Sequence, residues 1–224
     1  MTTSDPKEKL LDAALTHVVF DGWSEATFKA AIDDSGVTEA LAHALCPRGA
    51  VDLAVAYHKR GDAAMLARFA AEDVSELRYS QKVAALVRFR LEAVDDKETV
   101  RRGTALFALP HHAGTGAELI WGTVDAIWNA LGDTSEDVNW YTKRATLSGV
   151  YGSTVLFWLG DDSEGYQATW DFLDRRIENV MQFEKVKAQV KASPFGKLMQ
   201  GPMSALERIR KPGARGDMPG TWRG

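Results

Sequence analysis

The sequence predicts an all-α fold, a bundle of about nine or ten helices. Apolar residues recur at intervals of three and four along residues 10–18, 79–94 and 117–131, which is the helical period. No alternation of apolar and polar residues, the pattern of a strand, lasts as long as these segments. Glycine, proline and aspartate separate the segments and predict helix ends, which fall at 21–22, 35–36, 47, 103, 110, 132–133, 160–162, 194 and 212–213.

The first 52 residues predict a small unit of three helices packed on the body of the protein. An amphipathic helix over residues 10–23 is followed by a helix–turn–helix pattern over residues 27–45. In the turn, Gly36 supplies backbone freedom, Val37 an apolar plug, and Thr38 a side chain that can cap the next helix. This unit, residues 1–52, resembles the N-terminal unit of the TetR family of repressors.

The charge of this unit argues against DNA binding. Residues 1–52 carry four basic and nine acidic side chains, whereas duplex binding needs cations that neutralise phosphates. The helix that would read bases, "TEALAHALC", has no Arg, Lys, Asn or Gln to bond base edges. The whole chain has a net charge of −4. We therefore predict no nucleic-acid partner.

Residues 53–192 predict a helical body that is rich in aromatic side chains. Ten aromatic residues, including five of the seven tryptophans, fall between positions 121 and 172. Such rings either pack an ordinary core or line an apolar pocket between helices, and composition alone leaves both interpretations open. For a pocket that binds a lipid, the lining candidates are Trp121, Trp128, Leu147, Tyr151, Val155 and Trp158.

The stretch "NWYTKRATLSGVYGSTVLFWL", residues 139–159, lies in this region and predicts one helix. Its uncharged run, residues 145–160, is shorter than the roughly 20 apolar residues that a membrane span needs. The run also contains serine, threonine and glycine. We predict that its second half is core or cavity wall rather than a membrane span.

Residues 185–224 carry nine basic and two acidic side chains. Within them, residues 194–211 predict an amphipathic helix that lies in a membrane surface, because apolar residues near helical spacing alternate with cations. The alternative is a last helix docked on the body with a solvated basic face, and Gly201-Pro202 interrupts either helix. Residues 212–224 predict a disordered tail. The membrane-binding candidates are Phe195, Lys197, Leu198, Met199, Met203, Leu206, Ile209 and Arg210.

Few side chains are candidates for catalysis or metal binding. Glu39 and His43 are spaced i, i+4 and could share a metal, but no second Glu/His pair completes a bundle site. The histidines at 111–112 follow Pro110 and predict a helix start, while Cys46 predicts a buried, inert thiol. A single cysteine suits a reducing compartment. We predict no enzyme activity, no catalytic or metal-binding residue and no cofactor.

Three segments carry a family resemblance: "VDAIW", "NWYTKRATL" and "TWDFLDRRI". With the residues around them they resemble the Coq-nine family of ubiquinone-biosynthesis proteins of mitochondria and related bacteria. The resemblance continues more weakly over most of the chain. It implies a TetR-like fold, a homodimer, a cavity for an isoprenoid lipid, a C-terminal helix that engages the membrane, and no catalysis of the protein's own.

The resemblance also implies a partner, the di-iron hydroxylase that acts on demethoxyubiquinone. The residues that match the family's hydroxylase-facing surface are Trp140, Tyr141 and Arg144, beside Lys143, where the family commonly has arginine. On a helix Trp140 and Arg144 share one face, and these residue types are enriched in interface hot spots. From the residues alone, Trp140 could equally continue the core stripe, with Arg144 reaching out to water.

The N-terminal residues include Asp5, Glu8 and Asp12 and lack the apolar core of a signal peptide. The resemblance then favours a bacterial member, cytoplasmic and peripheral on the inner membrane. The predicted function is to bind an isoprenoid quinone intermediate and present it to the hydroxylase at the membrane surface. The alternative is a TetR-type transcription regulator with a lipid effector.

Overall fold

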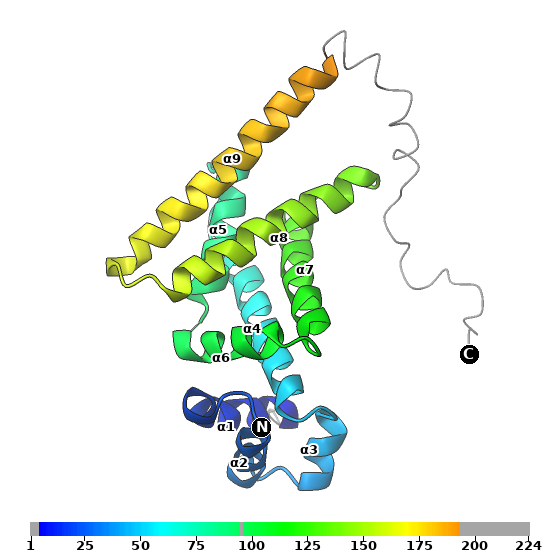
Figure 1. Ribbon diagram of the computed structural model, residues 1–224, viewed down its shortest axis with the longest axis vertical. Helices are drawn as coiled ribbons and strands as arrows, with labels where there is room; N and C mark the ends of the chain where they lie inside the picture. The colour runs from blue at the N-terminus through cyan, green and yellow to red at the C-terminus, as the bar shows by residue number, and fades with distance from the viewer. Residues whose placement is uncertain (1–4, 95, 193–224) are drawn as a thin grey trace, which may run out of the picture.

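The computed structural model describes residues 5–94 and 96–192, and within these ranges the all-α prediction is confirmed (Figure 1). The predicted membrane helix, 194–211, and tail, 212–224, lie outside the described residues. In the described part of the chain the elements are α1 (Pro6–Asp21), α2 (Glu25–Ser35), α3 (Glu39–Leu45), α4 (Ala50–Ala71), α5 (Tyr79–Glu92), α6 (Lys97–Ala108), α7 (Ala113–Ala130), α8 (Val138–Leu159), the short 3₁₀ helix η1 (Glu164–Tyr166) and α9 (Gln167–Ala192).

Helices α1 to α3 form the predicted N-terminal unit around a core of their own. Gly36 ends α2 in the left-handed conformation, at φ 68°, where a glycine avoids the strain of a β-carbon. Val37 is buried as the predicted plug. Thr38 occupies the N-cap position of α3, but its side chain makes no capping hydrogen bond. The helix–turn–helix geometry therefore depends on the glycine and the plug rather than on the cap.

Helix α4 carries the chain from this unit into the body without a linker. The boundary expected near residue 52 falls in its first turn. Leu53 belongs to the N-terminal core, whereas Met65, three turns further along, belongs to the body core. One continuous helix of 22 residues therefore fixes how the two cores are oriented, and Figure 1 shows it rising from the N-terminal helices into the body.

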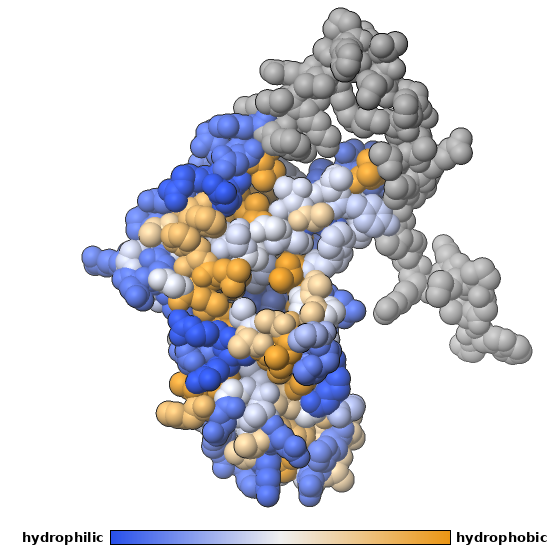
Figure 2. Space-filling model, viewed as in Figure 1, coloured by the Kyte–Doolittle hydropathy of each residue, from blue (hydrophilic) through white to orange (hydrophobic). Residues whose placement is uncertain are grey.

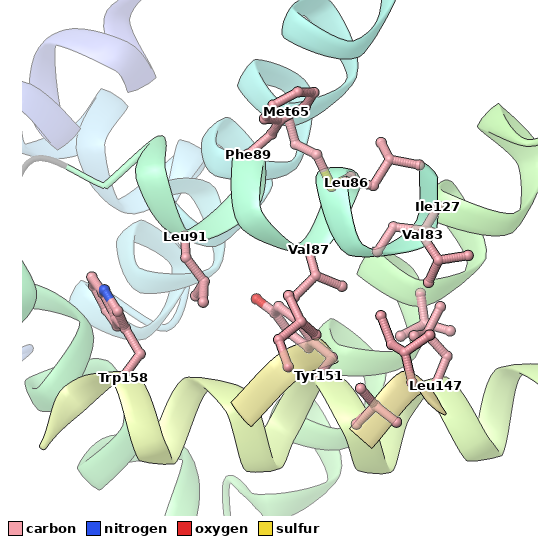
Figure 3. Close-up of a cluster of buried hydrophobic side chains, with 14 of the residues drawn as sticks. Met65, Val83, Leu86, Val87, Phe89, Leu91, Ile127, Leu147, Tyr151 and Trp158 are labelled. Atoms are coloured by element: carbon pink, nitrogen blue, oxygen red, sulfur yellow. The ribbon is translucent and has the colours of Figure 1, made fainter. Parts of the chain in front are cut away.

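The body core gathers buried side chains from α4, α5, α7, α8 and α9. Figure 3 shows Leu147, Tyr151 and Trp158 rising from α8 toward Val87 and Leu91 on α5. All five side chains are buried. They follow the helical spacing of the sequence, so the face of each helix that enters the core is the one its apolar residues predict.

Gly103 does not end a helix, so the predicted break at position 103 is wrong. It lies in the interior of α6, where glycine costs about 1 kcal/mol relative to alanine. A β-carbon there would come within 3.5 Å of Trp23 Nε1. This is an ordinary contact distance, so the indole of Trp23 packs against α6 here without requiring a glycine.

A buried arginine closes the corner between α7 and α8. Arg144 is 1% exposed, and its Nε donates to Asp125 Oδ1 at 2.6 Å while one Nη donates to Asp133 Oδ2 at 3.1 Å. Lys143 Nζ also reaches Asp133, at 2.8 Å. Burial works to raise the pKa of Asp133, but hydrogen bonds from Lys143, Ser135 and Arg144 outweigh it and hold the pKa well below its usual value. These bonds tie α7, the connecting loop and the start of α8 together.

We expect Arg144→Met to lower the free energy of unfolding by about 2–3 kcal/mol, because Asp133 keeps Lys143 as a partner but both Asp133 and Asp125 lose a charge-assisted hydrogen bond from Arg144. Urea denaturation at neutral pH measures the change. The matched control is Arg48→Met, which breaks an exposed pair with Asp52 and is expected to cost about 1 kcal/mol or less. Equal losses in the two variants would contradict a special role for the buried pair.

Candidate functional site

A cavity of about 500 Å³ opens between α4, α5, α6, α7 and α8. Its lining is mainly apolar, and Figure 2 shows hydrophobic side chains gathered across the middle of the face in view. Leu156 lines the cavity and is 62% exposed, so the cavity reaches the surface beside α8. The apolar lining includes Ala54, Leu91, Val100, Phe107, Ile120 and Val155.

Small residues allow the helices around the cavity to approach one another. Gly116 on α7 faces Phe107 of α6, whose β-carbon would lie 2.9 Å from a β-carbon built at Gly116. At Gly152 on α8 a β-carbon would meet no atom within 4 Å. The first glycine is therefore needed for close packing, while the second leaves open space in the cavity wall.

One wall of the cavity is polar, and we call it the polar wall: His58 and Asp62 on α4, Arg90 on α5, Thr123 on α7 and Tyr151 on α8. Arg90 Nε donates to Asp62 Oδ1 at 2.7 Å, and one of its Nη atoms donates to the His58 carbonyl at 3.0 Å. The Thr123 hydroxyl lies 2.8 Å from His58 Nε2 and 2.9 Å from Asp62 Oδ1. Of these five residues, His58, Arg90 and Tyr151 line the cavity, while Asp62 and Thr123 are bonded to them without lining it.

The environment of the polar wall sets its protonation. Burial, reinforced by the nearby Arg90 charge, lowers the pKa of His58 to about 4, so its imidazole is neutral at pH 7. Burial raises the pKa of Tyr151, which keeps the phenol protonated. Arg90 lies so close to α4 that a β-carbon at Gly61 would fall 2.6 Å from its Cζ. A glycine at position 61 is therefore required for the guanidinium to reach Asp62.

Two of the six predicted lipid-binding residues, Tyr151 and Val155, line this cavity. The prediction is wrong for the other four as cavity-lining residues. Leu147 and Trp158 point into the body core toward α5 (Figure 3). Trp121 packs against Trp140, with ring centroids 5.9 Å apart, and Trp128 packs against Tyr79 at 6.1 Å.

Sequence reasoning missed the contributions of α4, α5 and α6 to the cavity. Val100 and Phe107 on α6 and His58 on α4 line it, yet none lies in the aromatic-rich region. Helix-interior glycines were the available signal, since Gly103 and Gly116 both line the cavity. A glycine inside a helix is unfavourable on its own and so points to a packing or site requirement.

The predicted partner surface is divided by the structure. Trp140 and Tyr141 are half-buried at the start of α8, with ring centroids 4.8 Å apart. The expectation that Arg144 lies beside them on the surface is wrong, because its side chain is inside the α7–α8 corner. The Arg144 guanidinium carbon lies 4.0 Å from the centre of the Trp140 ring. Arg144 therefore supports the indole from within, held there by its bonds to two carboxylates.

The remaining sequence candidates hold structural positions. His112 occupies the N-cap position of α7, as the helix-start prediction implies. Cys46 is buried, and burial raises the pKa of its thiol. Glu39 and His43 lie 4.0 Å apart on α3, and the described residues contain no group of three side chains suited to a metal ion. Among the helices of residues 5–94 and 96–192, none has the length and hydrophobicity to cross a membrane.

The fold is shared with a crystal structure of a TetR transcriptional regulator from Nitrosomonas europaea. The TM-score is 0.63 at 21% sequence identity, and the match covers 78% of this chain and 97% of that chain. The TetR-like fold prediction is thereby confirmed.

Sequence comparison finds similarity to one family. The COQ9 family profile matches residues 113–184, which hold α7, α8 and most of α9. The mitochondrial ubiquinone biosynthesis protein COQ9 of Drosophila melanogaster is 31% identical over 188 residues, 82% of this chain and 57% of that protein. The COQ9 protein of Bos taurus is 37% identical over 109 residues, 49% of this chain and 34% of that protein. The chain thus covers less than two thirds of the length of either relative. Residues 113–184 are a COQ9 domain, and the chain is a homologue of the COQ9 proteins.

Proposed function

We propose that this protein is a non-enzymatic accessory protein of ubiquinone biosynthesis that holds an isoprenoid quinone intermediate in the cavity. The observation that carries the proposal is the cavity itself, with apolar walls and one polar wall. Its volume of about 500 Å³ falls in the range of about 300–1,000 Å³ that is usual for small-molecule sites. The COQ9 family profile matches residues that include α7 and α8, which supply part of the lining, and the COQ9 relatives are named for ubiquinone biosynthesis.

A binding role fits the polar groups of the cavity better than a catalytic one. Arg90 is paired with Asp62, and Thr123 joins His58 to Asp62. A general base needs a pKa near the working pH, whereas the pKa of His58 is lowered to about 4. These groups are therefore better suited to orient a ligand than to move its protons.

The aromatic pair Trp140 and Tyr141 is the proposed contact for the hydroxylase of the pathway. Trp121 lies beside Trp140, and Arg144 supports its ring. Rigid, partly exposed aromatic side chains of this kind supply contact area at little cost in conformational entropy. Arg144 takes the role of a positioning residue in this proposal.

Membrane attachment through residues 194–211 and a homodimer complete the proposal. The first is supported by the amphipathic, basic sequence of that segment, and the second by the TetR-like fold. Attachment to the bacterial inner membrane from the cytoplasm fits these features. A DNA-binding regulator is a weaker candidate, because α3 exposes Glu39, Leu41 and His43 rather than groups that bond bases or phosphates.

Filling the cavity is expected to abolish ligand binding. Gly152→Phe places a ring in open space of the cavity wall, so we expect quinone to disappear from lipid extracts of the purified protein, as measured by mass spectrometry. The matched control is Gly122→Phe on α7, where a β-carbon also meets nothing within 4 Å but the residue does not line the cavity. If wild-type protein from a quinone-producing host carries no quinone and takes up none, the proposed function is wrong.

Trp140→Ala is expected to weaken binding to the pathway hydroxylase by about 2 kcal/mol or more, as truncation of an aromatic hot spot does. The loss of stability should be smaller, about 0.5–2 kcal/mol, because the ring is half-buried and its contacts are the rings of Trp121 and Tyr141 and the guanidinium of Arg144. Calorimetric titration and thermal melting give the two values. Thr142→Ala, an exposed change on the same turn, should leave both unchanged. If Trp140→Ala lowers stability by as much as it weakens binding, Trp140 is a core residue rather than a contact for the hydroxylase.

Ending the chain at Ser193 removes the basic amphipathic segment and should abolish sedimentation with anionic liposomes. The shortened protein should keep the helical circular dichroism signal and the oligomeric state of the full chain. Neutral liposomes and high salt provide the controls for the electrostatic part of the attraction. Unchanged sedimentation of the shortened protein would contradict the membrane role of residues 194–211.

A further inference from the structure

Hydrogen bonds between three helices, α4, α5 and α7, fix most groups of the polar wall in position. Thr123 is fully buried and joins His58 to Asp62, both on α4. Asp62 in turn accepts from Arg90 on α5. Tyr151 on α8 is 3% exposed, and its phenol lies in the field of the Arg90 and Asp62 charges. A ligand that enters the cavity therefore meets a preorganised set of dipoles rather than side chains free to reorient.

The polar wall carries no net charge at neutral pH. The Arg90 charge is offset by Asp62, whose Oδ1 lies 2.7 Å from Arg90 Nε. His58 is neutral because burial and Arg90 lower its pKa to about 4, and Tyr151 keeps its proton because burial raises its pKa. No charge in the wall is thus left over to balance a charged ligand.

We infer that the polar wall selects a ligand whose head group is uncharged and carries oxygen acceptors, as quinone and phenol rings do, and disfavours the same tail ending in a carboxylate. This inference rests on the proposed function, because it assumes that an isoprenoid ligand occupies the cavity.

Two groups of the polar wall can donate a hydrogen bond to a neutral oxygen. A guanidinium has five N–H groups, and the bonds of Arg90 to Asp62 and to the His58 carbonyl use two of them. The phenol of Tyr151 is a second donor at the cavity surface. A carbonyl or methoxyl oxygen can accept from these groups without disturbing the ion pair.

A carboxylate meets two penalties in the same place. It loses its hydration among apolar walls, and burial of an ion without a partner is costly. It can share the guanidinium of Arg90 with Asp62, but one buried positive charge cannot balance two carboxylates, so a negative charge stays uncompensated. The pairing inside the wall thereby acts against anionic lipids such as fatty acids.

Calorimetric titration of the full-length protein at pH 7.5 tests the preference with two probes. One is a benzoquinone that bears a three-isoprene tail, and the other is a carboxylic acid with the same tail. We expect the quinone to bind at least about tenfold more tightly, a difference of about 1.4 kcal/mol. Equal dissociation constants would overturn the inference and leave the proposed function standing. Failure of both probes to bind would contradict the proposed function and the inference together.

Asp62→Asn removes the charge that offsets Arg90, so we expect the preference to shrink by at least about tenfold or to reverse toward the acid. Thr123→Val, which keeps the side-chain volume, should weaken quinone binding severalfold by freeing His58 from its bond to Thr123. Thr154→Val is the matched control, since Thr154 is a buried threonine that bonds a carbonyl of its own helix and does not line the cavity. The Thr154→Val variant should keep the wild-type preference for the quinone over the acid.

Melting temperatures separate ligand selection from structural support. If Asp62→Asn and Thr123→Val lower the melting temperature but keep the wild-type preference between the two probes, the polar wall is a brace between helices and the inference is wrong. If Asp62→Asn does not fold, the Thr123→Val result decides by the same comparison with Thr154→Val.

Discussion

The guanidinium of Arg144 holds the corner on which both proposed surfaces depend. It is the largest fully buried side chain among the described residues, and it is bonded to Asp125 on α7 and to Asp133 in the loop before α8. An arginine without these partners could not be buried at acceptable cost. Because the bonds fix the direction in which α8 leaves the loop, they also decide that Trp140 meets Trp121 and that Tyr151 and Val155 face the cavity.

Glycines set the second constraint, the distance between helices around the cavity. Gly116 lets α7 approach Phe107 of α6, and Gly61 lets Arg90 of α5 lie against α4. Each lies inside a helix, where it lowers helix stability by about 1 kcal/mol relative to alanine. The absence of a side chain at Gly116 makes room for the Phe107 ring, and its absence at Gly61 makes room for the Arg90–Asp62 ion pair. The apolar lining and the polar wall therefore both depend on these glycines.

The fold was predictable because helical periodicity and turn residues act locally. Gly36 and Val37 behave as their positions predict, whereas Gly103 lies inside α6, where its contact with Trp23 would also accommodate a β-carbon. The site was less predictable. An apolar helix face gives the same pattern whether it meets a side chain or a void, so Val155 and Trp158 could not be told apart. The burial of Arg144 depends on acids 19 and 11 residues earlier, and their spacing does not reveal that they converge.

The size of the cavity explains why the proposed function includes a membrane surface. A cavity of about 500 Å³ holds a head group and a short length of isoprenoid, and its lining reaches the exposed Leu156. Exposing the rest of a long tail to water would cost about 0.8 kcal/mol per methylene. If the tail stays in the bilayer while the head group enters the cavity, most of that cost is avoided. Trp140 lies eleven residues from Tyr151 on the same helix, about 16 Å away along its axis. A head group held at the polar wall is therefore within a short distance of the surface proposed to meet the hydroxylase.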